Sequence, residues 1–308
     1  MQLTSIDIGT NTILMLIADV KRDGAIRVIR DEHVIARLGK GVDEHRRILP
    51  ETFQRVLNIL DNYKQIHDGT RSDRIIACGT SALRDASNRD EFVEFIRSHA
   101  GITIEILSGD EEAELTYLGG VSEFIGTDTG RQFAVLDIGG GSTEFTFGQD
   151  AVVTSKVSMD IGCVRLTERF LKTSPPNLSG IGRAQEYVRE QASSLRSLDG
   201  GTRCIGVAGT LTTLAAIDLQ LAVYDRVRVS GHVLTIDSIE GIFELLKKKR
   251  LEEIKEIPQI LPQRADIILA GILILLELLR KTKVERITAS DRGLRYGILQ
   301  REARRSTL

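Results

Sequence analysis

The sequence predicts an α/β protein built from two related domains, and two observations carry this prediction. Strand-like and helix-like segments alternate along the chain, as they do in α/β folds. An acid-and-glycine motif also occurs twice: SIDIGTNTILMLIAD opens the chain and AVLDIGGGSTEFTFG repeats its pattern, with Asp7 and Asp137 at equivalent places. Two copies, each at the start of a half-chain, indicate an internal duplication. A length of 308 residues accommodates two domains.

The first half of the chain predicts a strand, a tight glycine turn and a second strand over SIDIGTNT and ILMLIADV. From Glu51 to Ile66 the apolar residues recur at helical spacing. RIIACGTSALRDA predicts a buried strand that ends in a glycine turn. Asn88 followed by Glu91 is typical of the start of a helix, and residues 102–107 alternate as in a strand.

The second half begins after a segment of small and polar residues, Gly120–Arg131, which we interpret as the junction between domains. This interpretation gives domains of residues 1–123 and 124–308, with the last helix able to pack back on the first domain. The closing LLRKTKVERITASDRGLRYGIL predicts a helix, a strand, a glycine turn and a final helix. The apolar run Ile267–Leu279 contains Glu277 and is too short to span a bilayer, so we expect a buried core helix.

The composition is ordinary for a soluble globular protein. Hydrophobic residues make up 42% and charged residues 27%, with a formal net charge of −2, which disfavours a generic nucleic-acid binder. Cys78, Cys163 and Cys204 lie far apart without metal or disulfide spacing, as suits a reducing compartment. No signal peptide is visible. We therefore expect a cytoplasmic protein without a membrane or nucleic-acid partner.

The motif DIGGGSTE is suited to phosphate and metal. Glycines allow the backbone to approach oxygen atoms and turn N–H groups toward an anion, and Asp137 offers a hard oxygen ligand for Mg²⁺. Backbone and hydroxyl donors would come from Gly139, Gly140, Gly141, Ser142 and Thr143. One such motif can equally be a plain β-hairpin with a glycine turn, but its partner DIGTNT favours the functional interpretation.

A third glycine element, CIGVAGTLTTLAAI, predicts a strand running through Gly206 to Gly209 and Thr210, where a helix begins. The amino terminus of a helix presents unpaired N–H groups and favours phosphate. An ordinary strand-to-helix turn is the alternative.

In SGDEEAELTYLGG, Ser108 with Glu111 three residues later predicts a capping box. That pairing leaves Glu112 free either to orient a water and accept its proton or to be a solvated surface acid. Arg84 suits phosphate oxygens or a helix-surface ion pair with Asp85 or Asp90. The basic runs at 247–250 and 280–283 are usually solvated faces, although such runs can also guide a polyanion.

Together these segments resemble the exopolyphosphatase and guanosine pentaphosphate phosphohydrolase family, Ppx/GppA. The likeness covers nearly the whole chain: DIGTNT, RLGKGV, TSALRDASN, SGDEEA, DIGGGSTE, GVAGT and SDRGLRYGIL. The resemblance implies two ribonuclease H-like domains of the actin and sugar-kinase superfold with a site in the cleft between them. It also implies a hydrolase that removes terminal orthophosphate from polyphosphate, from pppGpp, or from both, by in-line attack of water.

The resemblance further implies the roles of single residues. Glu112 would be the general base, and Asp137 together with Asp7 would hold Mg²⁺ or another divalent cation such as Mn²⁺. The phosphate chain would be bound by Asn11, Thr12, Arg84, Gly139, Gly140, Gly141, Ser142, Thr143, Gly209 and Thr210. A homodimer is common among soluble enzymes.

The sequence departs from the family pattern in two respects, and two other functions are alternatives. Some family members carry a further helical domain, whereas this sequence ends at residue 308 and resembles the short, two-domain form. Members of the short form often read V-H-G-x-V-L-T, whereas this chain reads VSGHVLT, with Ser230 at the histidine position and His232 two places on. An ATP-dependent kinase or ATPase of the same superfold, and a non-catalytic sensor of pppGpp or polyphosphate, are the alternatives.

Overall fold

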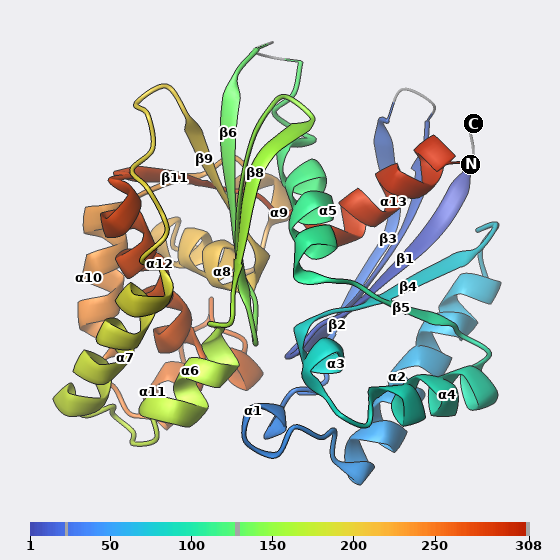
Figure 1. The fold of residues 1–308 in the computed structure, drawn as a ribbon, viewed down its shortest axis with the longest axis horizontal. Coiled ribbons are helices and arrows are strands. Elements are labelled where there is room, and N and C mark those ends of the chain that lie inside the picture. The colour runs from blue at the N-terminus through green and yellow to red at the C-terminus, as the bar shows by residue number, and fades with distance from the viewer. Residues whose placement is uncertain (22–23, 127–129, 306–308) are drawn as a thin grey trace. The chain divides into compact units, whose positions relative to one another are not determined.

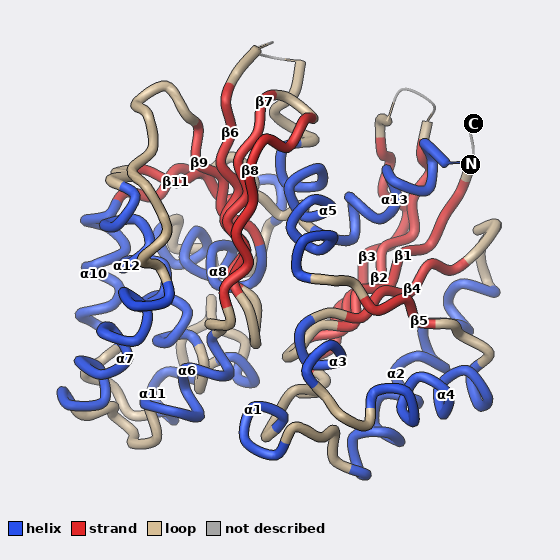
Figure 2. The backbone as a smooth tube through the Cα atoms, in the orientation of Figure 1, coloured by secondary structure: helices blue, strands red, loops and turns tan. Residues whose placement is uncertain are grey.

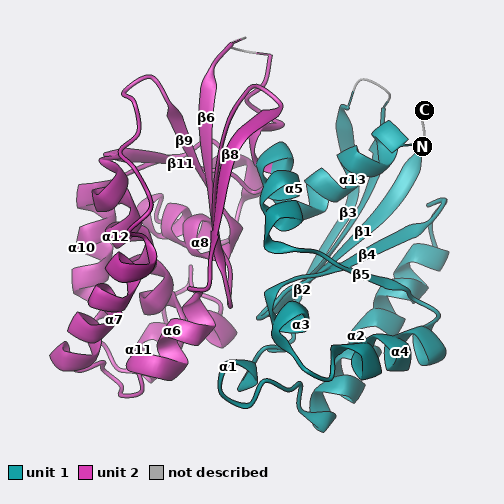
Figure 3. Cartoon of the chain, in the orientation of Figure 1, with its two compact units in different colours: residues 1–119, 293–308 teal, residues 120–292 magenta. Residues whose placement is uncertain are grey.

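The computed structural model describes residues 1–21, 24–126 and 130–305 (Figure 1). The chain forms two compact units, one of Met1–Gly119 with Gly293–Leu308 and the other of Gly120–Arg292 (Figure 3). We call these unit 1 and unit 2. The division lies at the start of the junction expected at 120–131, of which residues 127–129 are outside the described residues. The final helix belongs to unit 1, because its apolar residues pack on the first sheet.

Unit 1 is built on a five-stranded sheet (Figure 2). Its strands are β1 (Gln2–Ile8), β2 (Thr12–Val20), β3 (Ile26–Ile35), β4 (Ile75–Gly79) and β5 (Ile104–Ile106). The strand order is β3-β2-β1-β4-β5, in which β1, β2 and β3 run antiparallel while β4 and β5 continue parallel to β1. The helices are α1 (Val42–His45), α2 (Pro50–Asp68), α3 (Ser81–Asp85), α4 (Arg89–Ala100), α5 (Gly109–Val121) and α13 (Leu294–Arg305).

Unit 2 is built on a six-stranded sheet. Its strands are β6 (Gln132–Ile138), β7 (Thr143–Gln149), β8 (Val152–Met159), β9 (Arg203–Val207), β10 (Val233–Thr235) and β11 (Arg286–Ala289). The strand order is β10-β11-β9-β6-β7-β8. The helices are α6 (Cys163–Phe170), α7 (Leu178–Gln191), α8 (Ala208–Asp218), α9 (Arg226–Val229), α10 (Ile236–Leu246), α11 (Leu251–Lys255), the 3₁₀ turn η1 (Pro262–Arg264) and α12 (Ile268–Thr282).

The two sheets share one topology. In each, a three-stranded antiparallel meander is extended on the side of its first strand by parallel strands, β4 and β5 in unit 1 and β9 and β11 in unit 2. This is the ribonuclease H-like arrangement expected from the resemblance. The internal duplication predicted from the repeated motif is therefore confirmed at the level of strand order.

The two faces of the unit 1 sheet pack against different helices. Ile6 joins a core that includes Leu60 of α2, whereas Leu3 packs with Tyr296 of α13. Because side chains alternate along a strand, Asp7 lies on the face of Leu3. The acid of the first motif therefore points away from the larger helical layer of its unit.

In unit 2 the largest core lies between the sheet and the helices α7 and α12, where Leu136, Val188 and Leu275 are all buried. The prediction of a buried core helix at 267–279 is confirmed by α12. Its one acid, Glu277, is 4% exposed and accepts a hydrogen bond from Arg189 at 2.7 Å, so the buried charge is paired. In the described part of the chain no helix has the length and apolar character needed to cross a membrane.

Other predicted elements differ in detail. The helical spacing at 51–66 corresponds to α2, and that prediction is confirmed. The strand expected over 102–107 is shorter and covers Ile104–Ile106. Asn88 precedes α4, but its side chain does not cap the helix. Its amide instead accepts a hydrogen bond from the N–H of Ile48 at 2.9 Å and donates one to the carbonyl of Ile48 at 3.0 Å, because a buried loop needs those partners.

Candidate active site

The two acid-and-glycine motifs form equivalent hairpins. The N–H of Gly9 donates to the carbonyl of Thr12 at 3.0 Å, and the N–H of Gly139 donates to the carbonyl of Ser142 at 3.0 Å. A Cβ atom at Gly9 would lie 2.9 Å from that Thr12 oxygen, and one at Gly139 would lie 3.0 Å from the Ser142 oxygen. Both turns therefore require glycine at their first position.

In unit 2 the amino terminus of α6 holds the carbonyl groups of the glycine turn. Cys163 N–H donates to Gly139 at 3.0 Å, and Val164 N–H donates to Gly140 at 2.9 Å. The buried side chain of Arg165 donates from Nε to the carbonyl of Gly141 at 2.9 Å. The carbonyls of the glycine turn are thus fixed in place by the start of α6. Arg165 was missed in the sequence, where nothing links it to the loop.

The hairpin of unit 1 is held in the same way by the RLGKGV segment. Gly39 N–H donates to the carbonyl of Thr10 at 2.8 Å, and the N–H groups of Ala36 and Arg37 both donate to the carbonyl of Asn11 at 2.9 Å. Arg37 adopts a left-handed conformation with φ 49°, which a non-glycine residue rarely takes. The symmetry of these contacts extends the duplication from strand order to the loops.

Glu112 is buried on the first turns of α5, with 7% of its surface exposed. The capping box predicted before it is confirmed: Ser108 N–H donates to Glu111 Oε2 at 2.9 Å, and Glu111 N–H donates to Ser108 Oγ at 3.2 Å. The alternative of a solvated surface acid for Glu112 is therefore wrong. With Glu111 engaged in the cap, Glu112 is the carboxylate that α5 turns inward.

Arg84 is the partner of Glu112. Its Nη1 lies 2.9 Å from Glu112 Oε2 and also donates to the carbonyl of Leu107 at 2.9 Å. The alternative ion pair of Arg84 with Asp85 or Asp90 is therefore wrong. Burial raises the pKa of Glu112, and the guanidinium of Arg84 opposes that rise. A raised pKa makes a carboxylate a stronger base.

Asp137 faces a second carboxylate across the hairpin. It pairs in register with Glu144 of β7, and directly opposed residues of an antiparallel pair share one face with Cβ atoms about 4.5–5.5 Å apart. Glu144 is 1% exposed and accepts a hydrogen bond from Ser158 at 2.8 Å. Asp7 instead faces Leu14. Glu144 is the last letter of DIGGGSTE, and the register of the hairpin brings it opposite Asp137.

This donor set fits a divalent cation. Mg²⁺ is usually held by one or two carboxylates together with water and phosphate oxygens. Among the described residues no group of three or more His, Cys, Asp or Glu side chains forms a metal site. The carboxylates of Asp137 and Glu144, which oppose each other in register, have the chemistry that Mg²⁺ prefers.

The third glycine loop lies between the end of β9 and the start of α8, as predicted. Ala208, the first residue of α8, has φ 67°, and such strain concentrates at functional sites. A Cβ atom at Gly209 would lie 1.6 Å from Nη1 of Arg264, so this glycine makes room for a guanidinium beside the first turn of the helix. Arg264 comes from η1 and was also missed in the sequence.

Four predicted phosphate ligands contact other parts of the protein. Thr143 Oγ1 donates to the carbonyl of Ile161 at 2.6 Å. Thr210 packs on α12, with its hydroxyl 2.4 Å from where a Cβ atom of Gly271 would be. Asn11 Nδ2 lies 3.4 Å from Thr12 Oγ1, so these two side chains contact each other.

The basic runs form local ion pairs. Lys247 pairs with Glu244, and Arg250 Nε lies 3.3 Å from Glu253. Arg280 pairs with Glu240 at 2.6 Å. These contacts fit solvated faces.

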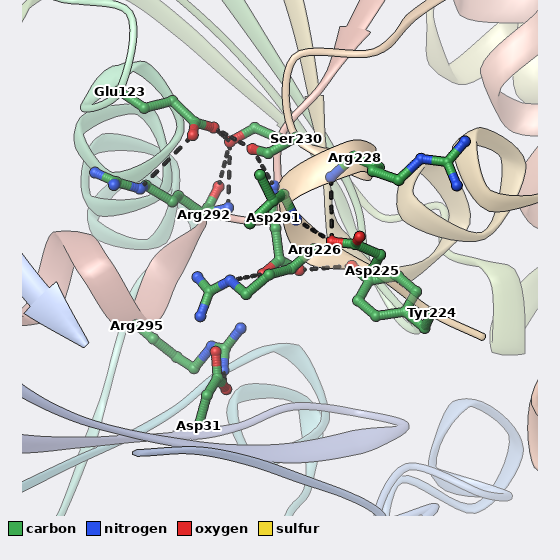
Figure 4. Close-up of polar contacts among 12 residues, drawn as sticks. Asp31, Glu123, Tyr224, Asp225, Arg226, Arg228, Ser230, Asp291, Arg292 and Arg295 are labelled. Atoms are coloured by element: carbon green, nitrogen blue, oxygen red, sulfur yellow. Dashed lines mark hydrogen bonds and ion pairs between the residues drawn. The ribbon is translucent and has the colours of Figure 1, made fainter. Parts of the chain in front are cut away.

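Ser230, at the position of the expected histidine, donates to Glu123 Oε1 at 2.6 Å (Figure 4). Ser290 donates to the same oxygen, also at 2.6 Å. His232 lies apart from this contact and pairs with Asp218 at 2.6 Å. Ser230 therefore has a structural partner that does not involve a histidine.

Comparison with known proteins gives one consistent result. A model of the Ppx/GppA phosphatase family matches residues 16–306. Exopolyphosphatase 2 of Mycobacterium tuberculosis is 36% identical over 313 aligned residues, which cover 96% of this chain and 97% of that protein. The crystal structure of the Aquifex aeolicus Ppx/GppA family member superposes with a TM-score of 0.84 at 34% identity, covering 100% of this chain and 99% of that one. An exopolyphosphatase structure from Cytophaga hutchinsonii gives a TM-score of 0.88 at 27% identity, covering 99% and 98%.

Proposed function

We propose that this chain, which belongs to the Ppx/GppA phosphatase family, releases terminal orthophosphate from inorganic polyphosphate, from pppGpp, or from both. The observation that carries the proposal is the buried pair of Glu112 and Arg84. Such a pair supplies an oriented base beside the positive charge of a guanidinium. Phosphoryl transfer to water requires little more than positioning and charge neutralisation. Relatives named exopolyphosphatase support the choice of a phosphoanhydride.

In the proposed reaction Glu112 accepts the proton of the attacking water. Arg84 orients the carboxylate and would also meet phosphate oxygens, for which its planar fork is suited. N–H groups of the two glycine hairpins and of the α8 amino terminus would bind the phosphate chain.

Asp137 and Glu144, with Asp7, would hold the divalent cation. Mg²⁺ or Mn²⁺ there would neutralise charge on the phosphate oxygens. Arg264, beside Gly209, and Arg165, hydrogen-bonded to Gly141, would add positive charge near those oxygens. Preorganised donors and cations of this kind stabilise developing charge without reorganisation during the reaction.

The test follows phosphate release from polyphosphate, pppGpp and ATP in parallel, with Mg²⁺ or with a chelator. Glu112→Gln is expected to lower turnover by about 10²–10⁴-fold. Glu114→Gln is the matched control, because Glu114 is an exposed acid on the same helix, and it is expected to keep turnover near that of the wild type. Near-normal release by folded Glu112→Gln protein would refute the proposed base.

The same experiment separates the rival functions. A kinase would pass phosphate from ATP to an acceptor without net phosphate release. A sensor would bind pppGpp or polyphosphate in the presence of Mg²⁺ without turnover. Either result would refute hydrolysis as the function of the chain.

A further inference from the structure

The closing motif SDRGLRYGIL brings α13 into backbone contact with α5 inside unit 1. A Cβ atom at Gly297 would lie 1.8 Å from the carbonyl oxygen of Leu115 and 2.9 Å from its Cα atom. One at Gly119 would lie 2.0 Å from the carbonyl oxygen of Gly293, directly before α13. The helix that carries Glu112 therefore touches α13 where glycine leaves no side chain between the backbones (Figure 3).

α13 is fixed to the sheet of unit 1 along its length. The hydroxyl of Ser5, which is fully buried, donates to the carbonyl of Arg295 at 3.0 Å. The guanidinium of Arg295 pairs with Asp31 of β3. Further along the helix, Arg301 Nη1 donates to Glu105 Oε1 of β5 at 3.0 Å. Because these contacts hold α13 against the sheet, added bulk in the helix contact would displace α5 instead.

Glu112 lies on the part of α5 that this contact supports. Leu115 follows it by three residues, about one turn along the same helix, and packs with Ile298 of α13. Arg84 comes from α3, and its Nη1 also donates to the carbonyl of Leu107, which precedes α5, at 2.9 Å. A displacement of α5 at Leu115 would therefore move Glu112 relative to Arg84, whose Nη1 now lies 2.9 Å from Glu112 Oε2.

We infer that Gly297 is a positioning residue for the proposed reaction, because the close approach it allows sets the place at which Glu112 meets Arg84. The inference rests on the proposed function and gives the closing motif a part in catalysis without contact to the substrate. A Cβ atom 1.8 Å from a carbonyl oxygen requires a movement of more than about 1 Å to reach ordinary contact distance. A misplacement of about 1 Å can lower turnover about 10²-fold.

The test measures kcat and KM for phosphate release from polyphosphate in the presence of Mg²⁺. In Gly297→Ala we expect kcat to fall about 10²-fold while KM stays within about threefold of wild type, because the change moves the base and leaves the glycine loops in place. Gly241→Ala is the matched control. Gly241 lies on α10 with nothing within 4 Å of an added Cβ atom, so both values are expected to stay unchanged.

A double variant separates positioning from a simple loss of folded protein. In a Glu112→Gln background the base is absent, so Gly297→Ala is expected to lower kcat by less than about threefold further, against about 10²-fold alone. An equal fall in both backgrounds would overturn the inference and leave the proposed function intact. Near-normal release by Glu112→Gln, or no release by wild type from polyphosphate or pppGpp, would refute the proposed function and the inference with it.

Two neighbouring truncations keep the test decisive if Gly297→Ala does not fold. Ile298 and Leu299 are both fully buried on α13, but Ile298 packs with Leu115 of α5 whereas Leu299 packs with Leu3 of the sheet. Ile298→Ala is expected to lower kcat about tenfold with KM within about threefold of wild type, and Leu299→Ala to leave both values within about threefold. Equal effects of the two truncations on kcat would contradict the positioning role.

Discussion

Replacing Arg84 with glutamine alters the charge that most directly opposes the raised pKa of Glu112. In the wild type, burial raises that pKa and the guanidinium lowers it. Without the guanidinium, desolvation acts alone and the protonated carboxyl is favoured further. A general base works only when it is deprotonated, so the acid limb of the activity profile must move to higher pH.

The geometry of the pair makes this movement measurable. Arg84 Nη1 lies 2.9 Å from Glu112 Oε2, and the two side chains are 23% and 9% exposed, so solvent screens the pair only in part. An opposite charge at such a distance holds the pKa of a carboxyl down, and its removal lets that pKa rise. We therefore expect the acid limb of kcat/KM to move to higher pH in Arg84→Gln.

The assay measures initial phosphate release from polyphosphate at saturating Mg²⁺ between acid and weakly alkaline pH. Arg97→Gln is the matched control, because Arg97 is an exposed arginine of unit 1 paired with Glu94. It is expected to leave the limb in place. Arg84 also belongs to the proposed phosphate ligands, so the absolute rate is expected to fall as well. The position of the limb isolates the effect on Glu112.

An acid limb that stays in place in Arg84→Gln, in protein that is folded, would refute this reasoning. It would mean that Glu112 is not the titrating base or that the pair is not formed during turnover.

The raised pKa of Glu112 also makes the stability of the fold depend on pH. Because the folded-state pKa of Glu112 is raised, this group favours folding when protonated, and that contribution is lost as pH rises through the folded-state pKa.

Two further predictions concern the loops of unit 2. Gly209→Ala places a Cβ atom 1.6 Å from Arg264 Nη1; the flexible guanidinium must move, so phosphate release is expected to fall about tenfold or more with little change in the thermal midpoint. Gly182→Ala, in open space on α7, is the control and should leave release unchanged. Arg165→Gln removes the Nε donor to the carbonyl of Gly141; it is expected to raise KM for polyphosphate and to cost about 1–3 kcal/mol of unfolding free energy, measured by urea titration. Equal KM values for this variant and wild type would show that the loop does not depend on that contact.

The sequence by itself determined the fold class and the duplication. Strand alternation and the two acid-and-glycine motifs are local signals, and each hairpin is closed by a hydrogen bond within four residues. The capping box of Ser108 and Glu111 is local in the same sense. Patterns of this kind can be read because the interacting residues are neighbours in the chain.

Only the tertiary structure decided which candidate residues face one another. Glu112 could have been a surface acid, and its burial against Arg84 depends on β4, α3 and α5 packing together. Glu144 became a candidate ligand through its register with Asp137. Arg165 and Arg264 lie far from the loops in sequence, and no local pattern brings a guanidinium beside Gly141 or Gly209. Long-range packing sets such distances, and it is a property of the folded chain as a whole.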